Sequence, residues 1–178
     1  MSQDDIVVWS KDSALSWSDF KAEPNPSVYE DSHSYIKYHY TWVVNSEQMG
    51  KDIFFFIENI HLSIEFHRVL SWVRISESNL DLLKHEQGHF DLGELVKRQN
   101  IDLIQSKFQD KHYPTRGQNE DQRKQNAKED SGKMIANEVE KLHETLSKMR
   151  KEYDEETEFG HNQQMQSKYD KIFENLRV

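Results

Sequence analysis

The chain has 178 residues, 35% of them hydrophobic and 31% charged, with no cysteine and a formal net charge of −9. This length suits one domain with a moderate core, and the acidic balance argues against a nucleic-acid-binding protein, which needs clustered Lys and Arg. The lack of cysteine excludes disulfides and thiol chemistry, and the lack of an 18-residue apolar run argues against a membrane-spanning helix. Any metal site must therefore be built from His, Asp and Glu.

The first part of the chain predicts a sheet. Ser34–Val44 is rich in aromatic and β-branched residues in rough alternation, which favours a strand. After a predicted turn at Asn45–Lys51, apolar runs at Ile53–Ile57 and Ile60–Phe66 favour one long strand or two in succession. A further short apolar segment follows at Leu70–Ile75. We expect the long strand to be buried on at least one face.

A long helix is predicted next. Ser76–Asn79 supplies N-cap candidates, so the helix is expected to start near Asn79 or Leu80. Apolar residues then recur at three- and four-residue spacing as far as Phe108. The helix is therefore expected to run almost to Lys111.

This helix carries an H-E-x-x-H motif formed by His85, Glu86 and His89. Helix positions four apart lie one above the other on the same face, so both imidazoles can reach one metal ion. The Glu86 carboxylate then lies beside the metal, where it can accept a proton from water. The motif predicts a zinc hydrolase with His85 and His89 as ligands and Glu86 as general base. The alternative is a surface helix with two solvated histidines.

The rest of the chain is predicted to be helical. Pro and Gly within His112–Asn119 break the preceding pattern. Five apolar residues then follow at spacings of 4, 3, 4 and 3, namely Ile135, Val139, Leu142, Leu146 and Met149. This stripe predicts a helix from about Asp121 or Asp130 to Lys151. A short helix is expected at Gln163–Leu176.

These elements indicate an α+β fold, with a strand-rich part over residues 1–76 and a helical part over residues 79–178. Sheet strands directly before a metal-binding helix are the arrangement of zincin folds, in which an edge strand can pair with a bound peptide.

Four blocks of the sequence are similar, in this order, to a bacterial domain family of uncharacterised function whose members are described as predicted secreted or periplasmic zinc-dependent proteases. The blocks are Leu15–Phe20, Ser71–Val73, Leu82–Asp91, and Tyr153–Thr157 with the downstream Gln166. The resemblance spans nearly the whole chain, and the order of the blocks is more specific than any one block. It implies one zincin-like α+β domain over residues 1–178, Zn²⁺ as cofactor, a peptide or protein substrate, and an exported protein of the periplasm or cell envelope.

The third metal ligand is expected in the acidic segment Tyr153–Asn162, because two histidines need a further protein ligand and a fourth position for water. The family pattern is Tyr-Asp-x-x-Thr-x-His-Gly, whereas Phe159 stands here where that His would fall. We predict His161 as the third ligand, with Asp154 or Glu158 as alternatives, unless the ligand is missing. The other interpretation is an acidic helix end with a glycine cap and a solvated His161.

Three further residues are candidates for supporting roles. Tyr153 can donate a hydrogen bond to an oxyanion, although a core anchor is the favoured role. Asp91 and Glu94 can orient the ligand imidazoles, although charges on a helix surface are the commoner explanation.

Two rival functions stay open at this point. A degenerate zincin-like domain would keep the fold and serve as a binding or scaffolding domain of the envelope, which the substitution at Phe159 supports. A metal-dependent hydrolase of a non-peptide bond, such as an amide of the cell wall, would use the same activation of water. Sites of His and carboxylate ligands also accept Co²⁺, Ni²⁺ or Mn²⁺.

Overall fold

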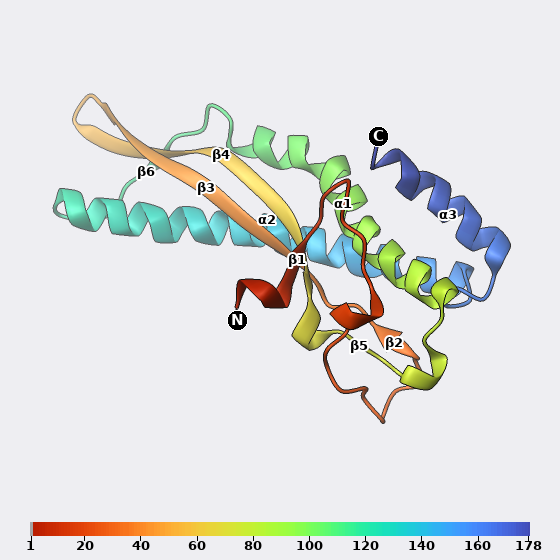
Figure 1. The fold of residues 1–178 in the computed structure, drawn as a ribbon. Helices are drawn as coiled ribbons and strands as arrows, with labels where there is room; N and C mark the ends of the chain where they lie inside the picture. Colours follow the sequence, from red (N-terminus) through yellow and green to blue (C-terminus); the bar gives the residue numbers. More distant parts are fainter. Residues whose placement is uncertain (1) are drawn as a thin grey trace.

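The computed structural model describes residues 2–178, in which antiparallel strands pack against long helices (Figure 1). The strands are β1 (Ile6–Val8), β2 (Ser32–His33), β3 (Ile36–Met49), β4 (Asp52–His67), β5 (Trp72–Val73) and β6 (Tyr113–Pro114). The helices are α1 (Leu80–Phe108), α2 (Glu120–Glu156) and α3 (Gln163–Asn175), with short 3-10 helices at Gln3–Asp5, Trp17–Asp19, Arg68–Leu70 and Ile75–Glu77. The fold is therefore α+β, as predicted.

The sheet is built on a long hairpin of β3 and β4. β4 is central and pairs with β1, β3 and β6, always in antiparallel orientation. The turn predicted over Asn45–Lys51 is shorter than expected and is confined to Gly50 and Lys51, because β3 continues to Met49, which lies opposite Asp52. Ladder hydrogen bonds to an apolar partner strand outweigh the low strand propensity of the polar residues in this stretch. The chain reverses only at Gly50, which has a φ of +68°.

A second, small sheet lies beside the start of α1. It consists of β2 and β5, with Ser32 opposite Val73 and His33 opposite Trp72. β2 leads directly into β3, so the short sheet continues the line of the hairpin towards the first turns of α1 (Figure 1). This position brings both strands to the cavity described below.

The helix boundaries follow their caps. α1 begins at Leu80 because the Asn79 side chain accepts a hydrogen bond from the Leu82 amide, which confirms the predicted start. α2 begins after the equivalent cap at Asn119. It ends at Glu156 and therefore continues five residues beyond the predicted end at Lys151. α3 starts at Gln163, as predicted.

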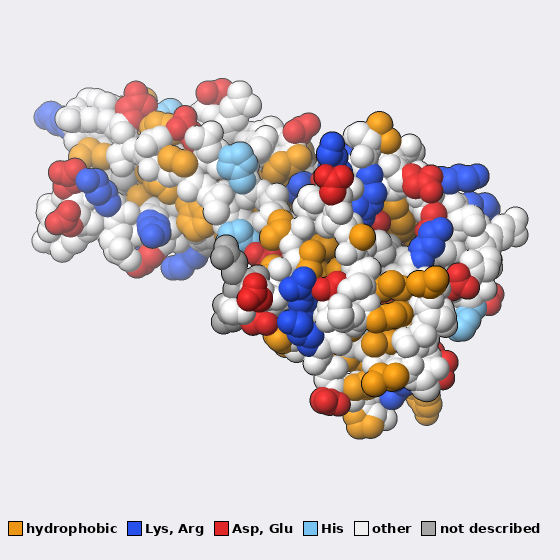
Figure 2. Space-filling model, in the orientation of Figure 1, with side chains coloured by type: hydrophobic (Ala, Val, Ile, Leu, Met, Phe, Trp, Pro, Cys, Tyr) orange, Lys and Arg blue, Asp and Glu red, His pale blue; other side chains and the backbone are white. Residues whose placement is uncertain are grey.

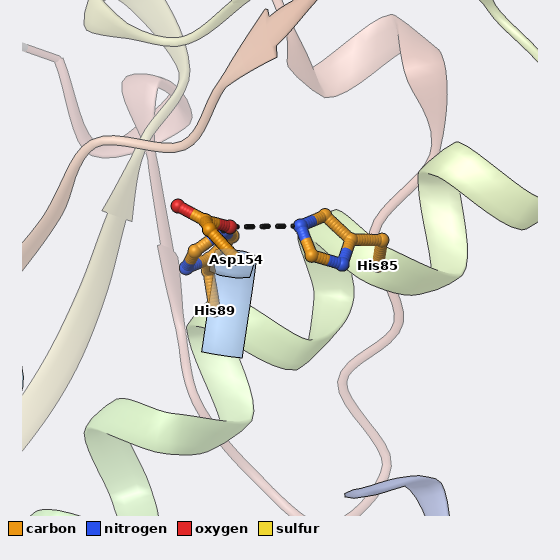
Figure 3. Close-up of side chains that lie close together, drawn as sticks. All are labelled: His85, His89 and Asp154. Carbon is orange, nitrogen blue, oxygen red and sulfur yellow. Dashed lines mark hydrogen bonds and ion pairs between the residues drawn. The ribbon is translucent and has the colours of Figure 1, made fainter. Parts of the chain in front are cut away.

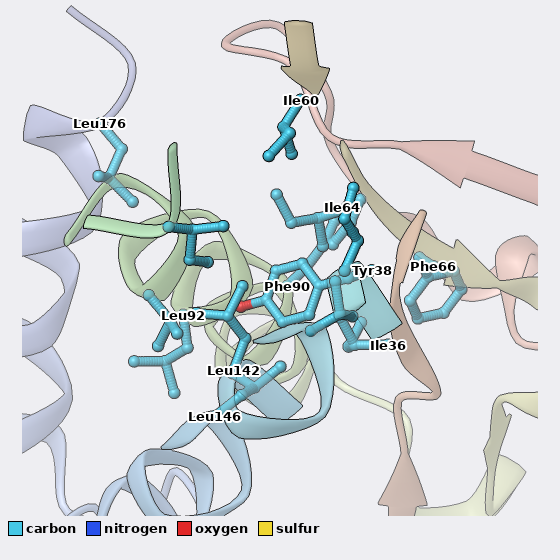
Figure 4. Close-up of a cluster of buried hydrophobic side chains, with 14 of the residues drawn as sticks. Ile36, Tyr38, Ile60, Ile64, Phe66, Phe90, Leu92, Leu142, Leu146 and Leu176 are labelled. Atoms are coloured by element: carbon cyan, nitrogen blue, oxygen red, sulfur yellow. The ribbon is translucent and has the colours of Figure 1, made fainter. Parts of the chain in front are cut away.

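The core lies where α1 crosses the hairpin and packs against α2 (Figure 4). Its members are apolar side chains of both strands and both helices, among them Ile36, Tyr38, Ile64, Phe66, Phe90, Leu92, Leu142 and Leu146. Burying a side chain of this size contributes roughly 1.5–3 kcal/mol. This contact fixes the motif-bearing turns of α1 relative to α2.

The distal part of the hairpin forms an elongated arm with β6 and the first half of α2 (Figure 1). We define the arm as residues 41–60 and 109–135. Acidic and basic side chains alternate over the arm, whereas exposed apolar side chains gather over the start of α1 (Figure 2). None of the described helices is both long enough and apolar enough to cross a membrane.

Candidate metal centre

The second and third turns of α1 place His85 and His89 on one face. Their side chains are almost fully buried, with relative exposures of 1% and 4%. The two rings are nearly perpendicular, with centroids 5.1 Å apart. Spacing of four residues in a helix gives this arrangement directly, as the sequence predicted.

The third member of the cluster is Asp154, near the C-terminal end of α2. Its Oδ1 atom lies 2.9 Å from His85 Nε2 and 2.7 Å from His89 Nε2 (Figure 3). The ligand atoms of all three residues lie within 4.8 Å of one another. Burial raises the pKa of Asp154, but the two imidazoles beside it, His85 and His89, lower it by more and hold it well below its usual range.

The donor set fits a divalent metal. Two imidazole nitrogens and one carboxylate oxygen are the ligands of many zinc sites that keep a fourth position open. Ligands about 2.1 Å from a tetrahedral Zn²⁺ lie roughly 3.4 Å apart. The separations of 2.7 Å and 2.9 Å therefore require only a small outward movement of the three side chains.

A chain of hydrogen bonds fixes the tautomer of His85. Its Nδ1 lies 3.1 Å from Gln166 Oε1, while the amide nitrogen of Gln166 donates to Tyr153 Oη and Asp170 Oδ1. Gln166 thus presents its oxygen to His85, so Nδ1 carries the proton and Nε2 keeps its lone pair. Two lone pairs, on His85 Nε2 and Asp154 Oδ1, face each other at 2.9 Å. They repel unless a cation, a proton or a metal ion, lies between them.

His89 faces a cation on its other nitrogen. Arg150 Nε donates to His89 Nδ1 over 3.0 Å, and because a guanidinium only donates, Nδ1 is the accepting atom. The proton of a neutral ring then lies on Nε2, directed at Asp154. Burial and, after it, Arg150 lower the pKa of His89, which favours the neutral ring. A metal on Nε2 would shift the ring proton to Nδ1, so the hydrogen bond from Arg150 has to open on metal binding.

Glu86 is held beside the cluster by two serines from the β2 region. Ser32 Oγ donates to Glu86 Oε1 over 2.6 Å, and Ser34 Oγ donates to Oε2. Burial raises the pKa of Glu86, but His89 and the two hydroxyls lower it by more, so the net shift is downwards. The carboxylate is therefore ionised at neutral pH and able to accept a proton.

These residues share one cavity of about 650 Å³. His85, Glu86, His89, Arg150 and Asp154 all line it. The remaining walls come from residues 25–34, from Trp72 and Leu82, and from the loop after α2. The cavity is wide enough for a small ligand or part of a chain to reach the metal ligands.

His161, the predicted third ligand, does not join the cluster. Its side chain is exposed and lines the cavity, whereas Asp154 supplies the third ligand atom. The loop turns through left-handed residues at Glu158 and Phe159, with φ of 50° and 54°. Gly160 then packs so closely on the helix that a Cβ atom would lie 2.9 Å from His85 Cβ. This path puts Phe159 on the cavity wall and leads His161 away from the metal ligands.

Neither predicted second-sphere carboxylate touches the metal ligands. Asp91 accepts hydrogen bonds from Trp9, Gln87 and Arg177, and so ties the two ends of the chain to α1. Glu94 pairs with lysine and arginine side chains of its own helix. Both are buried structural groups. The possible role of orienting the imidazoles and the favoured interpretation as charges on the helix surface are therefore both wrong.

Tyr153 acts as a core anchor, which was the favoured of its two predicted roles. It is fully buried, its ring stacks on His85 with centroids 4.5 Å apart, and its hydroxyl donates to the His85 carbonyl. Its hydroxyl therefore has no position from which to reach an oxyanion in the cavity.

Sequence reasoning missed Arg150 and the two serines. The signal for Arg150 was its position four residues before Asp154, which places both on one face of α2. Three convergent ligand atoms, a buried ionised carboxylate and a guanidinium thus meet in one cavity, a set that can bind a divalent cation and accept a proton from water.

Comparison of the chain with protein-family models, curated proteins and solved structures gave no match.

Proposed function

We propose that the protein is a zinc-dependent hydrolase that cleaves amide bonds of peptides or proteins. The observation that carries this proposal is the pair of facing lone pairs on His85 Nε2 and Asp154 Oδ1, which calls for a cation inside a cavity that also holds Glu86. His85, His89 and Asp154 would hold the metal. A bound Zn²⁺ would acidify a water molecule and polarise a carbonyl group.

The residues of the chain then have defined tasks in hydrolysis. Glu86 accepts a proton from water while the water oxygen bonds to the amide carbon, and the carbonyl electron pair moves to its oxygen. As that pair returns, the C–N bond breaks and the leaving nitrogen takes the proton from Glu86. The products are a carboxylic acid, which then releases its proton to solvent at neutral pH, and an amine. Ser32 and Ser34 keep Glu86 directed at the cavity throughout.

The backbone beside the cavity favours an extended peptide as substrate. The Arg74 amide donates to the Asp31 carbonyl across the small sheet, so the backbone groups of Ser32, one residue on, point to the opposite side. A peptide can pair with that side as an added strand. The sheet beside an H-E-x-x-H helix also supports a zincin-like arrangement, and the resemblance in the four sequence blocks supports an exported protease.

Replacing Glu86 with Gln tests this proposal. We expect zinc content to stay stoichiometric while hydrolysis of fluorescent casein falls by roughly 10²–10⁴-fold, because the proton acceptor is lost. Glu144→Gln, an exposed position on α2, is the matched control and should keep full activity. A zinc-loaded wild-type protein that hydrolyses casein no faster than Glu86→Gln would refute the proposal.

A second candidate is a metal-free binding domain, favoured by the hydrogen bond from Arg150 to His89. That bond suits a ring with its proton on Nε2, which is the state without a metal. In this case a proton on His85 Nε2 would be the cation between the facing lone pairs. Metal analysis of protein purified without chelator separates the two candidates, since the binding domain would hold no stoichiometric zinc.

A further inference from the structure

Arg150 is a partly buried cation that forms no ion pair within residues 2–178. Burial lowers the pKa of its guanidinium, although Glu86 and Asp154 counteract this shift from a distance. Removing a charge from water without a paired partner is unfavourable. The position therefore calls for a role other than fold stability.

Two hydrogen bonds attach the guanidinium to the reacting centre. Nε donates to His89 Nδ1 over 3.0 Å, and Nη2 donates to the Ser34 carbonyl over 2.7 Å. Ser34 in turn binds Glu86 through its hydroxyl. Without a metal, Arg150 is thus held both by His89 and by the serine that binds the general base. With a metal on His89 Nε2, the Nε hydrogen bond would open and the bond from Nη2 to the Ser34 carbonyl would keep the guanidinium beside the metal ligands.

The remaining donors of Arg150 are unused. Nη1 makes no hydrogen bond to any described residue, and it is not fully enclosed by protein. Arg150 is also the only Lys or Arg among the described residues that line the cavity. A guanidinium cannot lose its charge at neutral pH, so Nη1 is a permanent donor beside the metal ligands.

We propose that Arg150 is a catalytic residue that donates from Nη1 to the substrate oxygen on which negative charge develops. This inference rests on the proposed amide hydrolysis. In that reaction the carbonyl oxygen gains a full charge as the water oxygen bonds to carbon, and a donor positioned beforehand stabilises that charge without further reorganisation. Tyr153, the residue first considered for this task, is buried beneath His85 and cannot perform it.

The position of Arg150 favours the carbonyl oxygen of the bond to be cleaved over a terminal carboxylate. The hydrogen bond from Nη2 to the Ser34 carbonyl holds the guanidinium next to the serine that binds Glu86. This contact places Arg150 at the bond to be cleaved, whereas the terminal carboxylate of a peptide lies at least one residue away from it. The substrate class is therefore internal peptide bonds, without a requirement for a free C-terminus.

The test compares Arg150→Met, Arg150→Lys and the matched control Arg116→Met, an exposed arginine of the arm that pairs with Asp130. For Arg150→Met we expect kcat on casein to fall about 10²–10³-fold with KM within roughly threefold, as for loss of one oxyanion donor. Zinc should stay stoichiometric. Arg150→Lys should restore part of kcat because it returns one charged donor, and Arg116→Met should match the wild type.

Binding of methylphosphonate, a tetrahedral anion, gives a readout that needs no turnover. Calorimetry on zinc-loaded protein should show that Arg150→Met binds methylphosphonate at least about tenfold more weakly than the wild type does. This change corresponds to loss of a charge-assisted hydrogen bond. Equal affinity in the two proteins would overturn the proposal. The methylphosphonate titration tests the role of Arg150 even if the wild type fails to hydrolyse casein. Failure to hydrolyse casein would refute the proposed function alone.

Two other results would also overturn the assignment. A rise in KM at unchanged kcat, confined to peptides with a free C-terminus and absent from amidated ones, would make Arg150 a carboxylate-binding residue. Loss of zinc from both Arg150→Met and Arg150→Lys would make it a structural support of His89.

Discussion

The cavity end of the molecule and the arm are held together by different kinds of contact. At the cavity end, buried polar side chains such as His85, Glu86 and Gln166 satisfy one another in a continuous network. Among the described residues of the arm, Ser131 is the only buried polar side chain. The arm relies instead on apolar contacts such as that between the tilted rings of Phe55 and Tyr113, whose centroids lie 5.3 Å apart.

This difference teaches where the molecule is sensitive to change. A buried polar group that loses its partner costs about 1–3 kcal/mol, and its neighbours in the network lose their orientation with it. An apolar contact that is lost costs energy locally and leaves the rest in place. We therefore expect changes at the cavity end to affect both stability and metal binding, and changes in the arm to affect stability alone.

The largest expected effect is loss of metal from the cavity end. His89→Ala should abolish stoichiometric zinc, because three protein ligands share a binding free energy on the order of 10 kcal/mol and each supplies about a third. Asp154→Ala should behave in the same way. Equilibrium dialysis with metal analysis measures both.

His161→Ala is the matched control for this experiment. Its side chain lines the same cavity but lies outside the cluster of ligand atoms, so zinc content should not change. Loss of zinc from His161→Ala together with its retention in Asp154→Ala would restore His161 as the third ligand.

Local sequence signals predicted the helix that carries the motif. Asn79 as N-cap and the four-residue spacing of His85 and His89 depend only on neighbouring residues, and both agree with the structure. The α+β class followed from the same kind of signal. These features could be predicted because each is decided within one element.

The third ligand could not be predicted as reliably, because it depends on where α2 ends and how the following loop turns. With the helix ended at Lys151, Asp154 and His161 both lie in a loop. Tyr153 continues the apolar spacing four residues after Met149, which was a usable signal for a longer helix. The left-handed residues that turn His161 away leave no such trace in the sequence.

The end of β3 was predicted wrongly for a different reason. The residues from Asn45 to Met49 are mostly polar and resemble a turn, yet they pair with the apolar start of β4. Strand formation there depends on the partner strand, which lies outside any local window. Arg150 was missed for a similar reason. Its position four residues before Asp154 is a weak signal in a highly charged helix, and its role is visible only once its partners His89 and Ser34 are known.

A smaller effect is expected from a core change in the arm. Phe55 is 2% exposed, so Phe55→Ala should lower the free energy of unfolding by about 3 kcal/mol through lost burial and a cavity. Zinc affinity should stay within about twofold. Urea unfolding and a zinc titration on the same protein measure the two quantities.

Phe56→Ala is the neighbouring control, because this side chain is only partly buried and points to the other face of the strand. It should destabilise the protein less than Phe55→Ala. A tenfold change in zinc affinity for either variant would contradict the separation between the arm and the cavity end.

The smallest and sharpest comparison uses one glycine from each region. Gly88 and Gly132 both lie inside helices, where replacement by alanine alone would stabilise by about 1 kcal/mol. A Cβ atom at Gly88 would lie 2.1 Å from Tyr153 Oη and 2.7 Å from its Cζ. Tyr153 would then have to leave its stacking position on His85. Gly88→Ala should therefore destabilise by a net value of about 2 kcal/mol, and it should weaken zinc binding.

At Gly132 the nearest atom to an added Cβ is Cζ2 of Trp42, at 3.3 Å. Trp42 is only partly buried and borders a second cavity of about 560 Å³, so its ring has room to shift by a few tenths of an ångström. Gly132→Ala should therefore stabilise the protein by up to about 1 kcal/mol and leave zinc affinity unchanged. If the polar network of the cavity end and the apolar packing of the arm respond independently, urea unfolding should show opposite changes in the free energy of unfolding for the two variants. Only Gly88→Ala should then lower zinc affinity. A change of the same sign in the free energy of unfolding for both variants would contradict independent behaviour of the two regions and would indicate that α2 couples them.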